Sequence, residues 1–453
     1  MTALLGIAVV VTPQARARSG EPGEDRSGGR AVAHHSEGRI IKAPGVTSRA
    51  PDARVFDIGH DAVEPTLGLT KDGQIFYTAA GSRNEVVTSK DNGRTWKVVS
   101  PQLGGRNVHA ITLDPYIFVD EDTGRVFTID LTVACSLMSF SDDRGKTWTT
   151  NPLACGRPVN DHQTLFGGPP VSSPTIGYEN IMYYCWNDVA TSSCGKSLDG
   201  GITWRATGQP AFHPGDGTEG QSGMRHCGGL HGHGVVARDG TVYLPKEHCE
   251  EPWLSISHDE GTTWEHVRVS NKVAIWGPDP SVAVDNKGNI YYVFLSKDRL
   301  PYIATSRDGG ETWSRPVMLG FPGLTETVLA TLDVGAPGKI AVAYYGTDEV
   351  SGKIEDRTYE GVKWNGYITM SSNIFAEDPV FYSGNVNDPK YPFAMGDCGP
   401  RRCQEALDFI DVVVGFDGTP WAAFADSCVM VCEGLSVGNT GAAARMVGGP
   451  SLR

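Results

Sequence analysis

Long apolar runs, amphipathic helices and an excess of basic residues are all missing from this sequence. No stretch approaches the ~18–20 consecutive apolar residues that a membrane-spanning helix needs, so no membrane span is expected. No segment of useful length has the apolar period of an amphipathic helix, which favours an all-β chain. Lysine and arginine total 39 against 53 acidic residues, a net charge of −14. That surface repels phosphate backbones, so we expect no nucleic-acid partner, although a local arginine pocket could still bind an anion.

The N-terminus predicts export. A short apolar run over residues 4–11 is followed by Ala15-Arg16-Ala17, a cleavage signal of the A-x-A type. Residues 1–17 are therefore predicted to be a signal peptide that lacks its basic start, and the mature protein to be secreted. Residues 18–50, rich in Gly, Arg, Ser and Glu, are expected to be a disordered lead-in. A single domain is expected over residues 51–445.

The ten cysteines fit a secreted protein. Their order favours disulfides between neighbours, each closing a short loop. The expected pairs are Cys135–Cys155, Cys185–Cys194, Cys227–Cys249, Cys398–Cys403 and Cys428–Cys432. The alternative is a zinc site built from the last four cysteines, whose spacings also suit zinc ligands.

One eight-residue pattern, Ser-x-Asp-x-Gly-x-Thr-Trp, occurs five times. The copies are SKDNGRTW from Ser89, SDDRGKTW from Ser141, SLDGGITW from Ser197, SHDEGTTW from Ser257 and SRDGGETW from Ser306. The Asp carboxylate can accept hydrogen bonds from the backbone of a tight turn, and the Gly can take a positive φ. The Trp then begins the next strand with a large apolar face. The pattern predicts a strand–turn–strand unit and by itself no activity.

A second pattern, a turn followed by an apolar strand, occurs seven times. The copies are DGQIFYTA from Asp72, TGRVFTID from Thr123, ENIMYYCW from Glu179, DGTVYLPK from Asp239, KGNIYYVF from Lys287, PGKIAVAY from Pro337 and DGTPWAAF from Asp417. Together the patterns predict four short strands per repeat, the signature of a β-propeller blade. We expect a seven-bladed propeller whose last blade is completed by the strand near Arg54–Ile58, because an open ring would leave an exposed sheet edge. A six-bladed ring is the alternative, and residues 350–402 are an elaborated segment.

In these boxes the chain resembles the Asp-box (BNR-repeat) proteins, of which bacterial sialidases are the best-known enzymes. The resemblance covers Arg54 to Cys432 and implies a propeller with a glycoside hydrolase activity of the exo-sialidase type. Family sialidases share an Arg-Ile-Pro segment, three arginines for the substrate carboxylate, a Tyr nucleophile paired with Glu, and an Asp acid. This chain has Arg54-Val55-Phe56-Asp57 where Arg-Ile-Pro would stand. Tyr359 is our candidate for the nucleophile.

Propellers bind ligands at the mouth of the central channel, and here the segments leading into the inner strands are polar. They supply candidate carboxylates for glycoside hydrolysis, which needs an acid and a second carboxylate or its equivalent. These candidates are Glu64, Asp161, Asp279, Glu326 and Asp408. Any one of them could instead cap a turn.

Histidines give a second set of candidates. His231 and His233 are two apart on a strand, so both would face one surface, where His162 and Asp161 could join them to hold a metal or to act as a base. The alternative is that both histidines bond to backbone groups between blades. Arg225 could clamp a carboxylate, or form a rim salt bridge.

The leading hypothesis is a secreted, monomeric glycan-cleaving hydrolase that requires no cofactor, with a metal ion at the histidines left open. A polysaccharide lyase for uronic-acid glycans is the second, with His162 or His231 as base and Arg225 neutralising the carboxylate. A non-catalytic propeller that binds a glycan or a protein is the third.

Overall fold

The computed structural model describes most of the chain from residue 52 onward. The described residues are 34–37, 39–41, 52–80, 84–103, 106–107, 113–131, 136–153, 160–188, 191–213, 230–248, 250–271, 279–359, 361–395, 408–426 and 440–453. Across these ranges the one helical element is the single 3-10 turn η1 (Ile354–Asp356). None of the described helical structure is long and apolar enough to cross a membrane.

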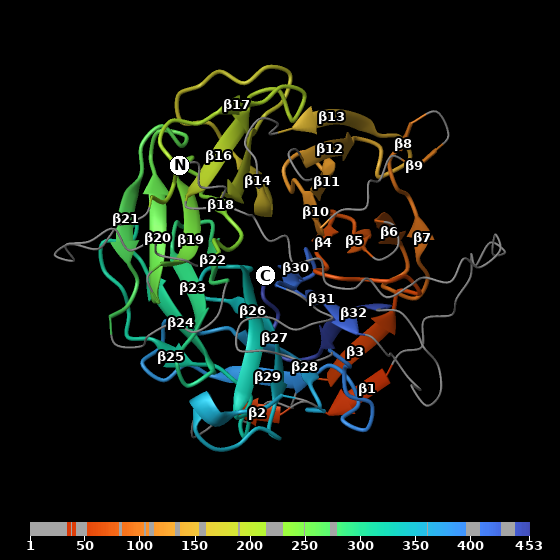
Figure 1. Ribbon diagram of the computed structural model, residues 1–453, viewed down its shortest axis with the longest axis vertical. Helices are drawn as coiled ribbons and strands as arrows, with labels where there is room; N and C mark the ends of the chain where they lie inside the picture. Colours follow the sequence, from red (N-terminus) through yellow and green to blue (C-terminus); the bar gives the residue numbers. More distant parts are fainter. Residues whose placement is uncertain are drawn as a thin grey trace, which may run out of the picture.

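Seven antiparallel sheets stand around a common centre, as the two repeats predicted (Figure 1). Blade 1 consists of β4 (Leu67–Leu69), β5 (Ile75–Ala79), β6 (Glu85–Ser89) and β7 (Lys97–Val98). Blade 2 consists of β10 (Leu113–Val119), β11 (Val126–Leu131), β12 (Ser136–Ser141) and β13 (Thr149–Leu153). Blade 3 consists of β14 (Asp161–Gly168), β15 (Ile181–Asn187), β16 (Ser192–Ser197) and β17 (Arg205–Ala206). Blade 4 consists of β18 (Val235–Val236), β19 (Val242–His248), β20 (Glu251–Ser257) and β21 (Glu265–Arg268). Blade 5 consists of β22 (Ser281–Val284), β23 (Ile290–Leu295), β24 (Pro301–Ser306) and β25 (Val317–Met318). Blade 6 consists of β26 (Glu326–Val334), β27 (Ile340–Thr347), β28 (Asn365–Ser371) and β29 (Phe381–Asn385). Blade 7 consists of β30 (Asp411–Val414), β31 (Pro420–Asp426), β32 (Thr440–Val447) and β3 (Asp52–Asp57). A hairpin of β8 (Gln102–Leu103) and β9 (Arg106–Asn107) follows blade 1.

The ring is closed by the two ends of the chain. Strand β3 pairs with β32 from Asp52↔Val447 to Asp57↔Ala442, so the N-terminal strand is the outer strand of the seventh blade. This confirms the predicted closure and the seven-bladed ring over the six-bladed alternative. Two further strands, β1 (His34–Glu37) and β2 (Arg39–Ile41), add to the outer edges of blades 7 and 6. The expectation of disorder across residues 18–50 is therefore wrong for these two strands, because sheet edges pair their backbone groups.

The Asp-box turn has the chemistry that its residues predicted. In the second box the backbone N–H and hydroxyl of Thr147 donate to Asp143 at 2.8 and 2.6 Å, and the Gly145 N–H donates to Ser141 Oγ at 2.8 Å. Gly145 has φ +79°. These bonds, those from Thr147 first, lower the pKa of Asp143 to about 2. The other four boxes repeat the Ser–Gly and Asp–Thr bonds.

The apolar core is divided into clusters that lie between adjacent blades. Buried tyrosines join the blades, because their hydroxyls reach carbonyls of the neighbouring sheet. Tyr77 donates to Phe424 O and Tyr345 to Ala425 O, both at 2.8 Å, and Tyr292 donates to the carbonyl of Trp253 at 2.9 Å. The blades are thus held together by apolar burial and by specific polar contacts.

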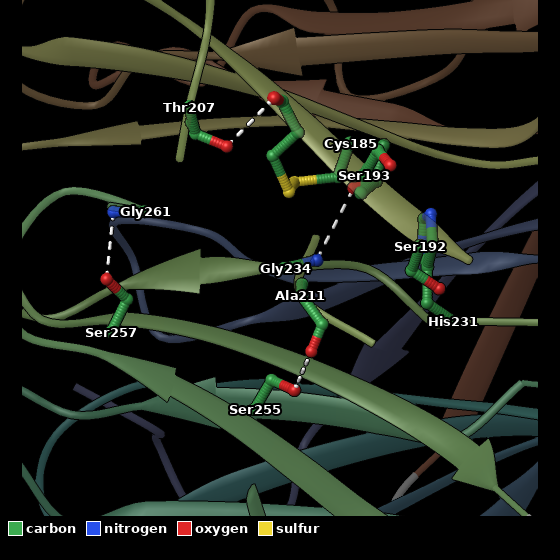
Figure 2. Close-up of a disulfide and its surroundings, with 12 residues drawn as sticks. Cys185, Ser192, Ser193, Thr207, Ala211, His231, Gly234, Ser255, Ser257 and Gly261 are labelled. Carbon is green, nitrogen blue, oxygen red and sulfur yellow. Dashed lines mark hydrogen bonds between the residues drawn. A yellow bond between two sulfur atoms is a disulfide. The ribbon is translucent and has the colours of Figure 1, made fainter. Parts of the chain in front are cut away.

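One predicted disulfide lies within the described residues. Cys185 and Cys194 are bonded between the paired strands β15 and β16 (Figure 2). The other eight cysteines lie outside the described residues, so their predicted pairing and the zinc alternative both remain predictions.

Candidate active site at the channel mouth

The first strand of every blade lines the central channel and runs in the same sense. Each inner strand starts at one end of the channel, which we call the mouth, and finishes at the glycine turn that leads to the second strand. The Asp-box turns, which follow the third strands, lie at the opposite end. Residues that precede the inner strands therefore gather at the mouth, although they are far apart in sequence.

Asp279 and His162 meet across the mouth. Asp279 Oδ2, just before blade 5, lies 3.2 Å from Nε2 of His162 on blade 3. The Asp279 side chain is 11% exposed and that of His162 only 2%. Burial raises the pKa of Asp279 well above 3.8, and the nearby carboxylates of Asp408 and Asp114 raise it further. Asp279 therefore keeps its proton to a higher pH than an ordinary aspartate.

Glu64 is a second carboxyl group with a raised pKa. It is 1% exposed, and its Oε1 accepts the backbone N–H of Asp408 at 3.0 Å, which joins blade 1 to blade 7. Burial is the main cause of its raised pKa, followed by the adjacent carboxylate of Asp114. Asp114 in turn accepts the backbone N–H of His162 at 2.8 Å. These contacts link four of the seven blades through one set of acidic groups.

His231 and His233 are neutral and packed. Burial lowers the pKa of His231 to about 3 and that of His233 to about 4. His231 Nδ1 lies 2.9 Å from the carbonyl of Gly232, and the His233 ring packs edge-to-face on Tyr116 at a centroid distance of 4.9 Å. A Cβ at Gly232 would lie 1.7 Å from the carbonyl oxygen of Pro280, so this strand needs glycine here. His231 thus contacts the backbone of its own neighbour and His233 packs on aromatic rings, so bonds of both histidines to backbone groups between blades remain a prediction.

Over the ranges that the structure covers, no three His, Cys, Asp or Glu side chains are grouped to hold a metal ion. The ring centroids of His162 and His231 lie 5.8 Å apart, and Phe409 packs on His162 at 5.1 Å. The metal site therefore remains a prediction.

Tyr359 and Glu326 lie together on the blade 6 side. Glu326, at the start of β26, is fully buried and accepts bonds from Arg299 Nε and, at 2.5 Å, from Arg357 Nη1. The pKa of Tyr359 is raised, mainly by burial, with a contribution from the Glu326 carboxylate to which its hydroxyl bonds. A tyrosine, a glutamate and two arginines thus form a compact group, although no sequence motif marked them.

The remaining candidates are less central or cannot be placed. Asp161 is the exposed first residue of β14. Arg225 lies outside the described residues, so its clamp role stays a prediction. Sequence reasoning missed Asp114, which is the second residue of β10 (Leu113–Val119).

Two hollows continue from the mouth into the ring. A small cavity of about 20 Å³ touches Asp279, Asp408 and Phe409, which is room for about one water molecule. A channel of about 370 Å³ runs on between the inner strands, with Asp333, Asp411 and Arg453 in its wall. The channel reaches Asp122 and Asn286, at the ends of the inner strands opposite the mouth.

Comparison with known proteins agrees with the repeat architecture. Residues 179–344 match a family model described as a BNR repeat-like domain. Three of the five Asp-boxes lie inside this match and two precede it. The chain is a seven-bladed β-propeller with Asp-box turns, and this match covers its central part.

The curated relatives of this Asp-box propeller are glycan-degrading enzymes. A xyloglucanase of Paenibacillus sp. is 25% identical over 276 residues, 53% of this chain and 24% of the relative. A xyloglucanase of Acetivibrio thermocellus is 25% identical over 289 residues, 57% of this chain and 32% of the relative. The chain thus spans about a quarter to a third of the length of these relatives.

Solved structures align with most of the chain but only loosely. A sialidase of Streptococcus pneumoniae has a TM-score of 0.44 at 12% identity, covering 92% of this chain and 71% of its own. The lectin of Aleuria aurantia has a TM-score of 0.42 at 11% identity, covering 67% of this chain and 91% of its own. Likeness at this level assigns no activity.

Proposed function

We propose that this protein is a secreted glycoside hydrolase whose reaction takes place at the channel mouth. The carrying observation is the convergence of carboxyl groups from several blades around Asp279, an acid with a raised pKa. Glycoside hydrolysis needs one protonated carboxyl group and one ionised carboxylate on either side of the glycosidic bond. The 25% identity to xyloglucanases supports a glycan substrate.

In this proposal Asp279 is the general acid. Its proton passes to the glycosidic oxygen as the bond to the anomeric carbon breaks, and a water molecule supplies the hydroxyl group of the new reducing end. Asp161 and Asp408 are the candidates for the ionised partner, because both carboxylates act on the pKa of Asp279. His162, 3.2 Å from Asp279, orients the acid.

The test is hydrolysis of xyloglucan and of a panel of aryl glycosides, measured as reducing ends or released phenol. Asp279→Asn should lower kcat by about 10²- to 10⁴-fold, the usual contribution of a general acid. Asp348→Asn, at an exposed aspartate of blade 6, is the matched control and should leave kcat unchanged. Activity in the wild type that survives Asp279→Asn would contradict this assignment.

A second candidate, exo-sialidase-type cleavage, is favoured by the group of Tyr359, Glu326, Arg299 and Arg357. Here Tyr359 would be the nucleophile and Glu326 its partner, as the family resemblance implies. The glycoside panel separates the two candidates: sialoside turnover abolished by Tyr359→Phe supports the second, and turnover confined to neutral glycosides excludes it.

A further inference from the structure

Blades 7 and 1 are neighbours where the ring closes (Figure 1), and two arginines lie on the face of blade 7 that packs on blade 1. Arg54 of β3 and Arg445 of β32 are direct partners in the antiparallel register, and Trp421 of β31 is the partner of Arg445 on its other side. Side chains that lie opposite one another in neighbouring strands point to the same side of the sheet. That side faces blade 1, because the Trp421 ring belongs to an apolar cluster that also contains Ile75 and Tyr77. Both arginines are half-buried there.

A third arginine reaches the same place from the first Asp-box turn, on blade 1. Gly93 of this turn has φ +81°, and a Cβ there would lie 3.3 Å from the Trp421 ring. The turn therefore packs directly on blade 7, and the next residue, Arg94, is exposed beside it. Burial lowers the pKa of Arg445, and the charges of Arg54 and Arg94 lower it further. Three guanidinium groups thus lie close enough to repel one another.

A stacked arginine elsewhere in the ring shows the usual solution, which is a carboxylate partner. Arg125 of blade 2 lies 4.2 Å from the ring centre of Phe140, and its Nε and Nη2 donate to Asp142 at 2.6 and 2.8 Å. Arg445 packs on an aromatic ring in the same manner, 5.1 Å from the ring centre of Trp421. The two arginines therefore differ in their polar partners and not in their packing.

No carboxylate takes this role at the closure of the ring. Among the residues that the structure describes, none forms an ion pair with Arg54, Arg94 or Arg445, which we call the seam cluster. The Nε atoms of Arg54 and Arg445 are buried and have no hydrogen-bond partner. Asp417, whose charge acts on Arg445, is exposed and accepts the backbone N–H of Thr419 at 2.9 Å. The seam cluster thus holds an excess of donors and of positive charge.

We propose that the seam cluster binds a tetrahedral oxyanion, the sulfate or phosphate group of a ligand. A guanidinium group offers parallel N–H donors that suit the oxygens of such a group. A dianion with three or four oxygens can be shared by arginines from two blades, whereas a carboxylate brings one charge and two oxygens. The net charge of −14 does not prevent this, because charges further away than about one Debye length are screened. The inference goes beyond the proposed function, since the cluster lies at the Asp-box end, opposite the mouth, and binding there requires no catalysis.

The probes are sodium sulfate, sodium phosphate, glucose 6-sulfate and glucose 6-phosphate, with glucuronate as the carboxylate comparison. Binding is measured at pH 8 by titration calorimetry, and stability as the melting temperature in chloride with and without each probe, at matched ionic strength. Arg94→Gln and Arg445→Gln each remove one charge from the seam cluster. Arg205→Gln is the matched control, an exposed arginine directly after the box tryptophan of blade 3. Because Arg94 is exposed, its replacement keeps the test valid if Arg445→Gln does not fold.

The dissociation constant for sulfate or phosphate should rise about tenfold or more in both cluster variants, because each loses charged donors. Low millimolar sulfate or phosphate should raise the melting temperature of the wild type and of Arg205→Gln, and should leave that of the cluster variants unchanged. In chloride alone Arg94→Gln should melt no lower than the wild type, because it relieves repulsion between like charges. An arginine that only supports the fold would give the opposite sign.

An equal rise of the melting temperature in all of these proteins would be a general salt effect and would overturn the proposal. No binding by the wild type, unchanged affinity in both cluster variants, or tighter binding of glucuronate than of the sulfate and phosphate probes would each do the same. Tighter binding of the sugar esters than of the free ions would support the proposal and identify a sulfated or phosphorylated sugar as the source, and equal binding would identify the free ion. None of these measurements involves hydrolysis, so a protein that binds the oxyanion and cleaves no glycan would refute the proposed function and leave this inference standing.

Discussion

Replacing Glu326 by Gln tests whether the buried ion cluster of blade 6 stabilises the mouth. Glu326 is fully buried, and its two partners Arg299 and Arg357 are only 1% and 10% exposed. Arg357 also donates to the carbonyl of Thr325 at 2.9 Å, which anchors the loop that carries Tyr359. Glutamine keeps the size and one acceptor oxygen but removes the charge that both guanidinium groups face.

The expected loss follows from the burial of the two arginines. Removing one partner of a buried ion pair costs about 3–5 kcal/mol, because the remaining charge is left without compensation. At about 2.1 cal/mol/K of unfolding entropy per residue, the 453-residue chain loses roughly 1 kcal/mol of stability per kelvin at its midpoint. Glu326→Gln should therefore lower the melting temperature by about 3–5 °C.

Calorimetry with a matched control gives the measurement. Glu349→Gln removes an exposed carboxylate of the same blade, which lies 3.6 Å from Lys363 Nζ, and should cost less than about 1 kcal/mol. Arg357→Met added to Glu326→Gln should recover part of the loss, since it removes one uncompensated charge. If both glutamine variants melt within about 1 °C of the wild type, the cluster contributes no more than a surface pair and the reasoning is wrong.

Two buried acids and the disulfide give three further predictions. Burial raises the pKa of Asp411 to about 7 from 3.8, so the stability that its protonated form contributes is present below pH 3.8 and is lost as the pH rises through 7. The melting temperature of Asp411→Asn should therefore rise relative to that of the wild type between pH 5 and pH 8. An equal difference between the two proteins at both pH values would contradict this. Because the pKa of Asp279 is raised, any hydrolytic rate should fall on the alkaline side as that proton is lost, and a rate that rises there would exclude an acid role. The Cys185–Cys194 bridge closes a loop of sequence separation 9, so the double alanine variant should lose about 2–3 kcal/mol in denaturant unfolding, whereas an unchanged midpoint would show that the bridge adds nothing.

The fold could be predicted from the sequence because its units are local. Each Asp-box turn is built from residues within eight positions, and the Asp143–Thr147 bonds need nothing from elsewhere in the chain. Ring closure by residues 52–57 could also be predicted, since a strand was needed for the last blade. The pairing of β1 and β2 with outer edges could not be predicted, because the composition of residues 18–50 contains no strand pattern.

The mouth could be predicted only in outline. Glu64, His162 and Asp279 were expected to meet there, and the Asp279–His162 distance of 3.2 Å places two of them together. Asp114 was missed, although Glu64-Pro65, Asp114-Pro115 and Asp279-Pro280 share an acid followed by a proline just before or within an inner strand. The Glu326 cluster could not be foreseen, because its arginines come from loops of two blades whose spacing no local rule relates.

Backbone strain gives an independent reason to place function at the mouth. Inner strands β10, β14 and β26 each shift register near their start, and the residue within the shift has a positive φ: Asp114 at +57°, His162 at +50° and Leu329 at +56°. Glu64 has φ +49° at the start of blade 1. Residues other than glycine rarely hold this conformation, which costs of order 1–3 kcal/mol each, and bulges of this kind re-aim side chains next to active sites. Such strain would be unnecessary if the inner strands only packed the ring, since β22 and β30 pair without a shift. The strained residues include the acid Glu64, the acid Asp114 and the histidine that meets Asp279, which is why we locate the chemistry at these inner-strand starts and treat the regular Asp-boxes as scaffold.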